Sequence, residues 1–193
     1  EIASCLVGSE MCIRDRLYRR YTGESLAVKL SDFADVSERI QYLVTQVEEI
    51  TKIDNFGAYL TAMLEIDAFF MNEDRHTNNI AVIYNEKTQK YELSPFFDQG
   101  LCMFADINQD YPIDQSLEYC LEKIEAKPFS SDFDIQLDAA EELYGIQIGF
   151  QFTFKDIQIY LQKNSENYPR EVIRRVEQLL RRQMRKYGYL MKK

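Results

Sequence analysis

Hydrophobic residues recur with a helical period over most of this chain. Between residues 31 and 53 they are three or four positions apart, which predicts an amphipathic helix with Asp32 or Asp35 as its N-terminal cap. The next stretch, 54–71, is apolar around most of its circumference, so we expect a buried helix at the centre of the fold. Further helical patterns occur in four places: 116–126, 134–145, 154–164 and 169–190.

Two short segments have the composition of strands. Residues 79–85 and 90–96 are rich in strand-forming side chains, and the polar residues 86–89 separate them, which predicts a β-hairpin directly after the central helix. Residues 146–152 alternate with a period of two, which favours a strand, although the helical neighbours leave other structures open. We interpret residues 101–114 as a loop with room for one short strand. The predicted fold class is therefore α+β, mainly helical, with one small hairpin.

Composition and charge narrow the class of protein. The chain has 193 residues, 46% of them hydrophobic, which suits one packed domain. Its net charge of −9 is uneven, because the segment 169–193 holds nine basic residues against two acidic ones. The acidic remainder argues against direct nucleic-acid binding, which Lys and Arg drive. We interpret the basic segment as a solvated face that pairs with the protein's own acidic surface; binding to an acidic partner or a membrane surface is the second interpretation.

Neither a membrane span nor a cysteine-based metal site is indicated. No apolar run reaches the roughly 18 residues that a membrane helix needs, so we expect no membrane partner. The four cysteines, Cys5, Cys12, Cys102 and Cys120, form no C-x-x-C pair, and the single histidine, His76, cannot complete a usual zinc site. Because no disulfide framework is indicated either, a reducing cytoplasm fits best.

The first residues differ from the rest of the chain. Residues 1–16, "EIASCLVGSEMCIRDR", show no periodicity and lack the cationic start and long apolar stretch of a signal peptide. They resemble translated sequencing-adapter read-through. We therefore expect 1–16 to be a non-native or disordered leader and 17–193 to form the domain. A frayed native terminus is the alternative.

A polar stretch, "MNEDRHTNNI" at 71–80, separates the central helix from the hairpin. Asp74 and Asn79 lie in this stretch, and Asp98 follows the second strand. Because a hairpin returns the chain to its starting point, we expect these three side chains to converge. Two carboxylates and a carboxamide suit Mg²⁺, which binds a few protein oxygens together with substrate phosphates, so the set points to phosphoryl transfer.

The order of these motifs resembles a known family. Asp, four residues, Asn, a hairpin and then Asp-x-Gly is the order of the catalytic and metal loops in kinase-like folds. "NEDRHTNN" at 72–79 and "YELSPFFD" at 91–98 resemble the HipA family of bacterial serine/threonine kinases. That family has a comparable Asn-x-Asp-Arg-His-x-x-Asn loop and a Leu-x-Pro-x-x-Asp strand end. Phosphatidylinositol kinases share the Asp-Arg-His-x-x-Asn pattern, but "LSPFFD" favours HipA. The resemblance covers roughly residues 34–190.

The resemblance implies a role for each residue of the motifs. Asp74 would be the catalytic base for the acceptor hydroxyl, and Asn79 and Asp98 would hold Mg²⁺, with Asp98 bridging the metal and the phosphates of ATP. Arg75 would orient the loop by pairing with a carboxylate, and His76 would contact a phosphate or brace the loop. The implied reaction transfers the γ-phosphate of ATP to Ser or Thr of a protein substrate, and an antitoxin-like protein partner is a further implication. We expect the remaining loop residues to face solvent: Glu73, Thr77 and Asn78.

The ATP-gripping part of a kinase is not recognisable in the chain. No G-x-G-x-x-G motif is present, and "LAVKL" at 26–30 only superficially resembles the kinase strand that carries the phosphate-binding lysine. Only 45 positions separate Lys29 from Asp74, and two helices fill most of them, so we expect Lys29 at the surface. The chain therefore resembles a kinase-like C-terminal lobe without its N-terminal lobe, a fragment with little activity alone. The alternatives are a non-catalytic pseudokinase-type interaction module and a lipid-kinase lobe.

Overall fold

The computed structural model describes residues 9–11, 18 and 21–192. Helices dominate this part of the chain, and a small antiparallel sheet completes it, so the prediction of a mainly helical α+β fold is confirmed. The elements are, in order, β1 (Ser9–Met11), α2 (Leu26–Ser31), α3 (Val36–Thr51), α4 (Phe56–Phe70), η2 (Thr77–Asn79), β2 (Val82–Asn85), β3 (Lys90–Leu93), α5 (Leu117–Lys123), α6 (Phe133–Tyr144), α7 (Phe154–Lys163), α8 (Arg170–Lys186) and η3 (Gly188–Leu190).

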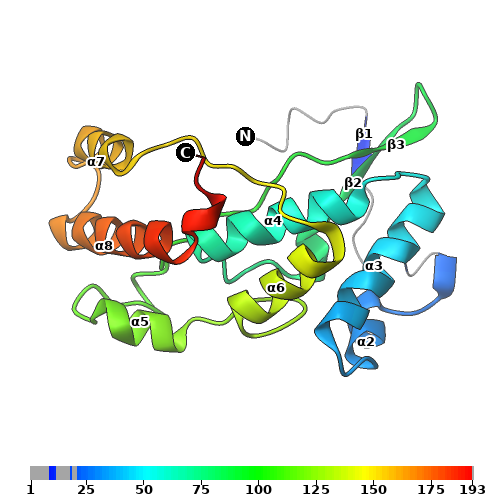
Figure 1. Cartoon of the computed structure of the whole chain (residues 1–193), viewed down its shortest axis with the longest axis horizontal. Coiled ribbons are helices and arrows are strands. Elements are labelled where there is room, and N and C mark those ends of the chain that lie inside the picture. The colour runs from blue at the N-terminus through cyan, green and yellow to red at the C-terminus, as the bar shows by residue number, and fades with distance from the viewer. Residues whose placement is uncertain (1–8, 12–17, 19–20, 193) are drawn as a thin grey trace.

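Helix α4 runs through the middle of the molecule (Figure 1). Its Phe56, Leu60 and Leu64 are fully buried in one apolar cluster with α3, α6 and β2. Its C-terminal turns belong to a second cluster, where Phe69 packs with residues of α5 and α8. Because α4 contributes to both clusters, most of its residues are buried and none is exposed, as its sequence predicts.

The other predicted helices form close to their expected positions. Asp35 is the actual cap of α3, because its Oδ1 accepts hydrogen bonds from the backbone N–H of Ser37 (2.8 Å) and Glu38 (3.2 Å). Residues 26–30 form helix α2 and no strand, and Lys29 makes a partly exposed ion pair with Asp32 (3.1 Å). The expectation of a surface position for Lys29 is therefore confirmed.

The sheet contains the predicted hairpin and one additional strand. β2 and β3 pair antiparallel, with Val82 opposite Leu93 and Asn85 opposite Lys90, and residues 86–89 form the turn. β1 pairs antiparallel with the other edge of β2. Residues 1–16 show no strand pattern, but a strand as short as β1 pairs through its backbone and needs none. The remainder of 1–16, which includes Cys5 and Cys12, lies outside the described residues.

Residues 146–152 are extended but form no strand of a sheet, so the strand that their alternation favours is wrong. The buried carboxylate of Glu65 on α4 accepts hydrogen bonds from the backbone N–H of Gln147 (2.8 Å) and Ile148 (2.6 Å). Phe150 makes a single parallel bridge with Met191. The Glu65 side chain and the bridge to Met191 thus provide hydrogen-bond partners for this segment, and in a sheet a neighbouring strand would provide them. Residues 101–114 are loop throughout, without the short strand.

The basic face of α8 pairs in part with the protein's own acidic residues, as expected. Lys186 lies 2.6 Å from Asp134 of α6. Arg175, by contrast, is buried, and its guanidinium donates to three backbone carbonyls of the loop before α5, at Tyr111, Pro112 and Gln115.

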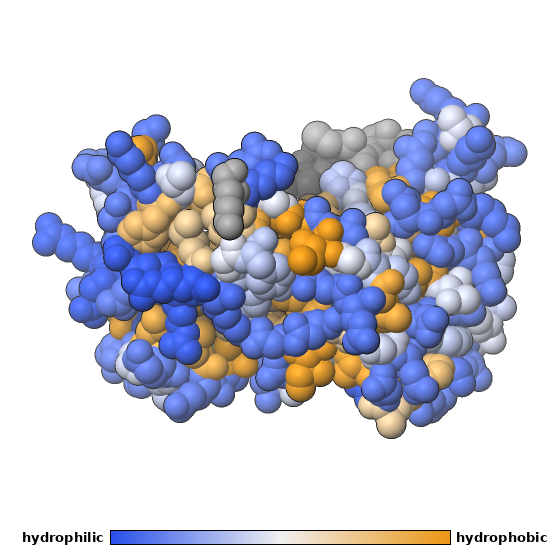
Figure 2. Space-filling model, viewed as in Figure 1, coloured by the Kyte–Doolittle hydropathy of each residue, from blue (hydrophilic) through white to orange (hydrophobic). Residues whose placement is uncertain are grey.

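The surface seen in Figure 2 is mostly hydrophilic, and hydrophobic residues appear there as separate patches. Among the described helices, none combines the length and the apolar composition that crossing a bilayer requires.

Truncation of α4 tests whether it is the central element. We expect Leu60→Ala to lower the free energy of unfolding by about 2–5 kcal/mol, because it leaves a cavity where two helices and the sheet meet. The control is Val28→Ala on α2, where the side chain is 64% exposed and the change should stay within about 0.5 kcal/mol. Denaturant titration measures both, and equal losses would contradict the central position of α4.

Candidate functional site

The polar loop 72–80 begins where α4 ends. Met71 has a left-handed backbone conformation (φ 54°), which stops the helix and turns the chain. Within the loop, the carbonyl of Asp74 accepts from the backbone N–H of His76 (2.8 Å) and from the side-chain amide of Asn79 (2.9 Å). These bonds hold Asp74 and Asn79 in one compact loop that includes η2.

The loop is fixed to α4 by a buried ion pair. Arg75 and Asp67 are both fully buried, and the guanidinium binds the carboxylate with two hydrogen bonds, Nε to Oδ2 (2.7 Å) and Nη2 to Oδ1 (3.0 Å). The amide of Asn72 adds a third bond to Oδ1 (2.8 Å). Burial raises the pKa of the Asp67 carboxyl, whereas Arg75 and Asn72 act to lower it. The carboxylate that the sequence predicts as partner of Arg75 is thus Asp67.

The same guanidinium joins the loop to the segment after the hairpin. Its Nη1 donates to the carbonyl of Asn79 (2.9 Å) and to the carbonyl of Phe97 (3.0 Å), the residue before Asp98. The chain after Asp98 returns to the end of α4, where the N–H of Met103 donates to the carbonyl of Phe70 (2.9 Å). The two predicted site segments therefore lie side by side, with Arg75 between them.

Asp98 ends this segment in an exposed position. Its backbone is left-handed (φ 58°), a conformation that Asp and Asn tolerate better than most residues. Its carboxylate makes no hydrogen bond or ion pair with any residue that the structure describes. Among the described residues, no three His, Cys, Asp or Glu side chains are grouped so that they could hold a metal ion. The metal site predicted from the sequence has a different set of donors, the carboxylates of Asp74 and Asp98 and the amide of Asn79.

Two basic groups flank the carboxylate of Asp74. Nζ of Lys127 lies 3.6 Å from Oδ1, and Nε2 of His76 lies 3.9 Å from Oδ2. All three side chains are partly exposed, so each contact contributes about 0–1 kcal/mol to stability. Lys127 comes from the loop between α5 and α6, far along the chain, and sequence reasoning missed it.

The expectation that Glu73 and Thr77 face solvent is wrong. Thr77 is buried, and the partly buried carboxylate of Glu73 accepts a hydrogen bond from the hydroxyl of Tyr111. Burial raises the pKa of Glu73, and the bond from Tyr111 acts to lower it. Asn78 is exposed, as expected. The loop packs more tightly than its polar composition indicates, because its neighbours supply hydrogen-bond partners.

Sequence reasoning also missed Asp67 and Asn72. A signal existed for the first, because Glu65 and Asp67 are carboxylates inside an otherwise apolar helix. A carboxylate in a buried segment needs a charged or hydrogen-bonding partner. Both have one: Glu65 binds backbone N–H groups and Asp67 binds Arg75.

The chain matches no protein-family model, no curated protein and no solved structure.

Replacement of Arg75 tests whether the buried ion pair with Asp67 supports the polar loop. We expect Arg75→Met to lower the free energy of unfolding by about 3–5 kcal/mol, because Asp67 is left buried without its partner. The double variant D67L/R75M should lose less than R75M alone, since no charge then remains buried. Arg174→Met, at an exposed position on α8, is the control. A loss in R75M no larger than in the control would show that the ion pair does not support the fold.

Proposed function

We propose that this chain is the catalytic lobe of a HipA-like kinase, which transfers the γ-phosphate of ATP to Ser or Thr of a protein substrate. The observation that carries the proposal is the double contact of Arg75 Nη1 with the carbonyls of Asn79 and Phe97. It puts the segment with Asp74 and Asn79 next to the segment that ends at Asp98. The order of these residues in the sequence is the order of the two loops in kinase-like folds.

Rigid support of the loop suits this chemistry. Phosphoryl transfer depends mainly on the positioning of the reactants and on neutralisation of the phosphate charge. The buried pair between Arg75 and Asp67 ties the loop to the core helix, which limits the movement of the loop. Asp74, partly exposed, is the residue that accepts the proton of the acceptor hydroxyl.

The oxygens of Asn79 and Asp98 are suited to a magnesium–nucleotide complex. Since the amide nitrogen of Asn79 is bound to the carbonyl of Asp74, its Oδ1 is the atom that remains for a cation. The exposed carboxylate of Asp98 is the second donor. Mg²⁺ bound by these two groups would neutralise charge on the transferred phosphate. Because the sequence has no Gly-rich phosphate loop, we expect weak nucleotide binding by the chain alone.

Paramagnetic Mn²⁺ with ATP tests the nucleotide site even when binding is weak. We expect amide NMR signals near Asp74, Asn79 and Asp98 to broaden, and the broadening to disappear in Asp98→Asn. Asparagine tolerates the left-handed backbone at this position, so the variant removes the charge without adding strain. Asp138→Asn, an exposed change on α6, is the control. Equal broadening in wild type and D98N would remove Asp98 from the site.

Removal of the base tests the reaction. In a full-length protein that joins this lobe to an ATP-gripping lobe, we expect Asp74→Asn to lower the rate of phosphate transfer to a Ser/Thr protein substrate by about 10²–10⁴-fold, the usual contribution of a general base, while the circular dichroism spectrum stays unchanged. Transfer is measured as incorporation of labelled γ-phosphate. An unchanged rate would exclude Asp74 as the base, and transfer to inositol lipids in place of protein would favour a lipid kinase. Mg²⁺-dependent nucleotide binding without any transfer would favour a pseudokinase.

A further inference from the structure

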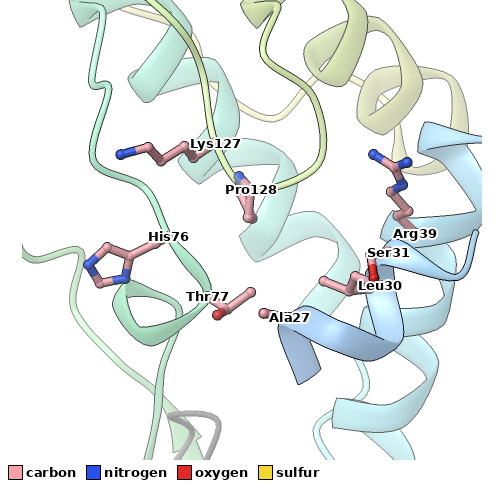
Figure 3. A pocket seen from close by; sticks show the side chains of 8 residues that line it. All are labelled: Ala27, Leu30, Ser31, Arg39, His76, Thr77, Lys127 and Pro128. Carbon is pink, nitrogen blue, oxygen red and sulfur yellow. The ribbon is translucent and has the colours of Figure 1, made fainter. Parts of the chain in front are cut away.

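A small pocket is lined in part by His76 and Lys127, the two residues that flank the carboxylate of Asp74. It has a volume of about 250 Å³. Helix α2 supplies Ala27 and Leu30, the loop before α6 supplies Lys127 and Pro128, and the polar loop supplies His76. Figure 3 shows Lys127 and His76 on one side of the pocket, with α2 across from them. The two residues that flank the carboxylate of Asp74 are therefore also part of the pocket wall.

The charge of the wall is opposite to that of the whole protein. Three residues of the pocket have basic side chains, Arg39, His76 and Lys127, and the carboxylate of Asp74, 3.6 Å from Nζ of Lys127, offsets part of their charge although Asp74 does not line the pocket. Arg39 is held in place because it donates to the carbonyls of Phe33 (2.9 Å) and Phe129 (2.7 Å). In a chain with a net charge of −9, a basic pocket next to Asp74 is a local exception that favours anionic groups.

His76 contributes a partly exposed imidazole to the wall, but its Nδ1 has no accessible surface and is out of reach of a ligand. Across from His76 and Lys127, α2 supplies the apolar side chains of Ala27 and Leu30 (Figure 3). The pocket thus combines an apolar wall with a basic edge.

These features fit one amino-acid side chain. The volume is below the roughly 300–1,000 Å³ of pockets that hold whole small-molecule ligands. A glutamate or aspartate side chain is of this size, and its carboxylate would complement the positive charges of Lys127 and Arg39. Because Lys127 and His76 lie within 4.0 Å of Asp74, a side chain bound there is only a few residues from the reacting hydroxyl.

We propose that this pocket binds an acidic side chain of the acceptor protein, close in sequence to the Ser or Thr that receives the phosphate. The inference rests on the proposed function, since Asp74 connects the pocket with the reaction. It defines the substrate class as acid-flanked Ser/Thr segments.

Peptide binding measured without ATP tests the pocket separately from catalysis. Fluorescein-labelled peptides with one Ser carry either Glu or Gln at the three positions on each side of it, and anisotropy with the full chain gives their affinities. We expect the Glu peptides to bind about fivefold more tightly than the Gln peptides, as for a partly exposed ion pair. The difference should shrink at about 1 M salt, where the Debye length is about 3 Å.

Two variants change the pocket in different ways. Lys127→Glu reverses the charge at a half-exposed position and should abolish or invert the preference for Glu. Ala27→Leu narrows the pocket at an exposed position of α2 and should weaken binding of the Glu peptides without a change of charge. Lys87→Glu, in the exposed hairpin turn, is the control for net charge and should keep the fivefold preference.

The outcomes separate the two proposals. A Glu preference that K127E abolishes or inverts and K87E keeps, together with weaker Glu-peptide binding in A27L, supports the pocket, even when no phosphate is transferred. Equal binding of Glu and Gln peptides, or an unchanged preference in K127E, overturns the pocket, and phosphate transfer by the same preparation would then leave the proposed kinase function intact.

Discussion

The candidate site depends on one buried ion pair, between Arg75 of the polar loop and Asp67 of α4. Burial of two charges is costly, and it is offset only when the geometry is good and the remaining donors are satisfied. The geometry is good, and four of the five N–H groups of the guanidinium have an acceptor. Two hydrogen bonds join the charged groups, and Nη1 donates to the carbonyls of Asn79 and Phe97. The planar guanidinium of Arg75 therefore sets the position of the polar loop relative to the segment that follows β3.

The two buried carboxylates of α4, Glu65 and Asp67, each bind an irregular segment of the chain. Asp67 holds the polar loop through Arg75, and Glu65 holds residues 147–148 through their backbone N–H groups. In both cases an irregular segment lies against the most buried helix and receives its hydrogen-bond partners from a side chain of that helix. The two apolar clusters on either half of α4 keep these carboxylates in place. Buried carboxylates of α4 thus hold two irregular segments, the polar loop and residues 147–148.

The local pattern of the sequence was a good guide where structure depends on near neighbours. The helix periods, the cap at Asp35 and the polar turn between β2 and β3 all appear in the structure. The pattern was a poor guide where a partner comes from elsewhere. Residues 146–152 alternate like a strand, yet Glu65 and not a neighbouring strand binds Gln147 and Ile148. Glu73 has a charged side chain of the kind that usually faces solvent, yet it is partly buried and accepts a hydrogen bond from Tyr111.

The sequence by itself determined the helices from α3 onward, the hairpin and the polar loop that follows the central helix, because periodicity, caps and turn residues act over a few positions. The family resemblance of that loop also implied a carboxylate partner for Arg75. Only the tertiary structure decided which groups meet: Arg75 with Asp67 and with Phe97, 22 positions away, and Lys127 with Asp74. These contacts depend on burial and on hydrogen-bond geometry between distant segments, and a local pattern of polar and apolar residues carries no information about either.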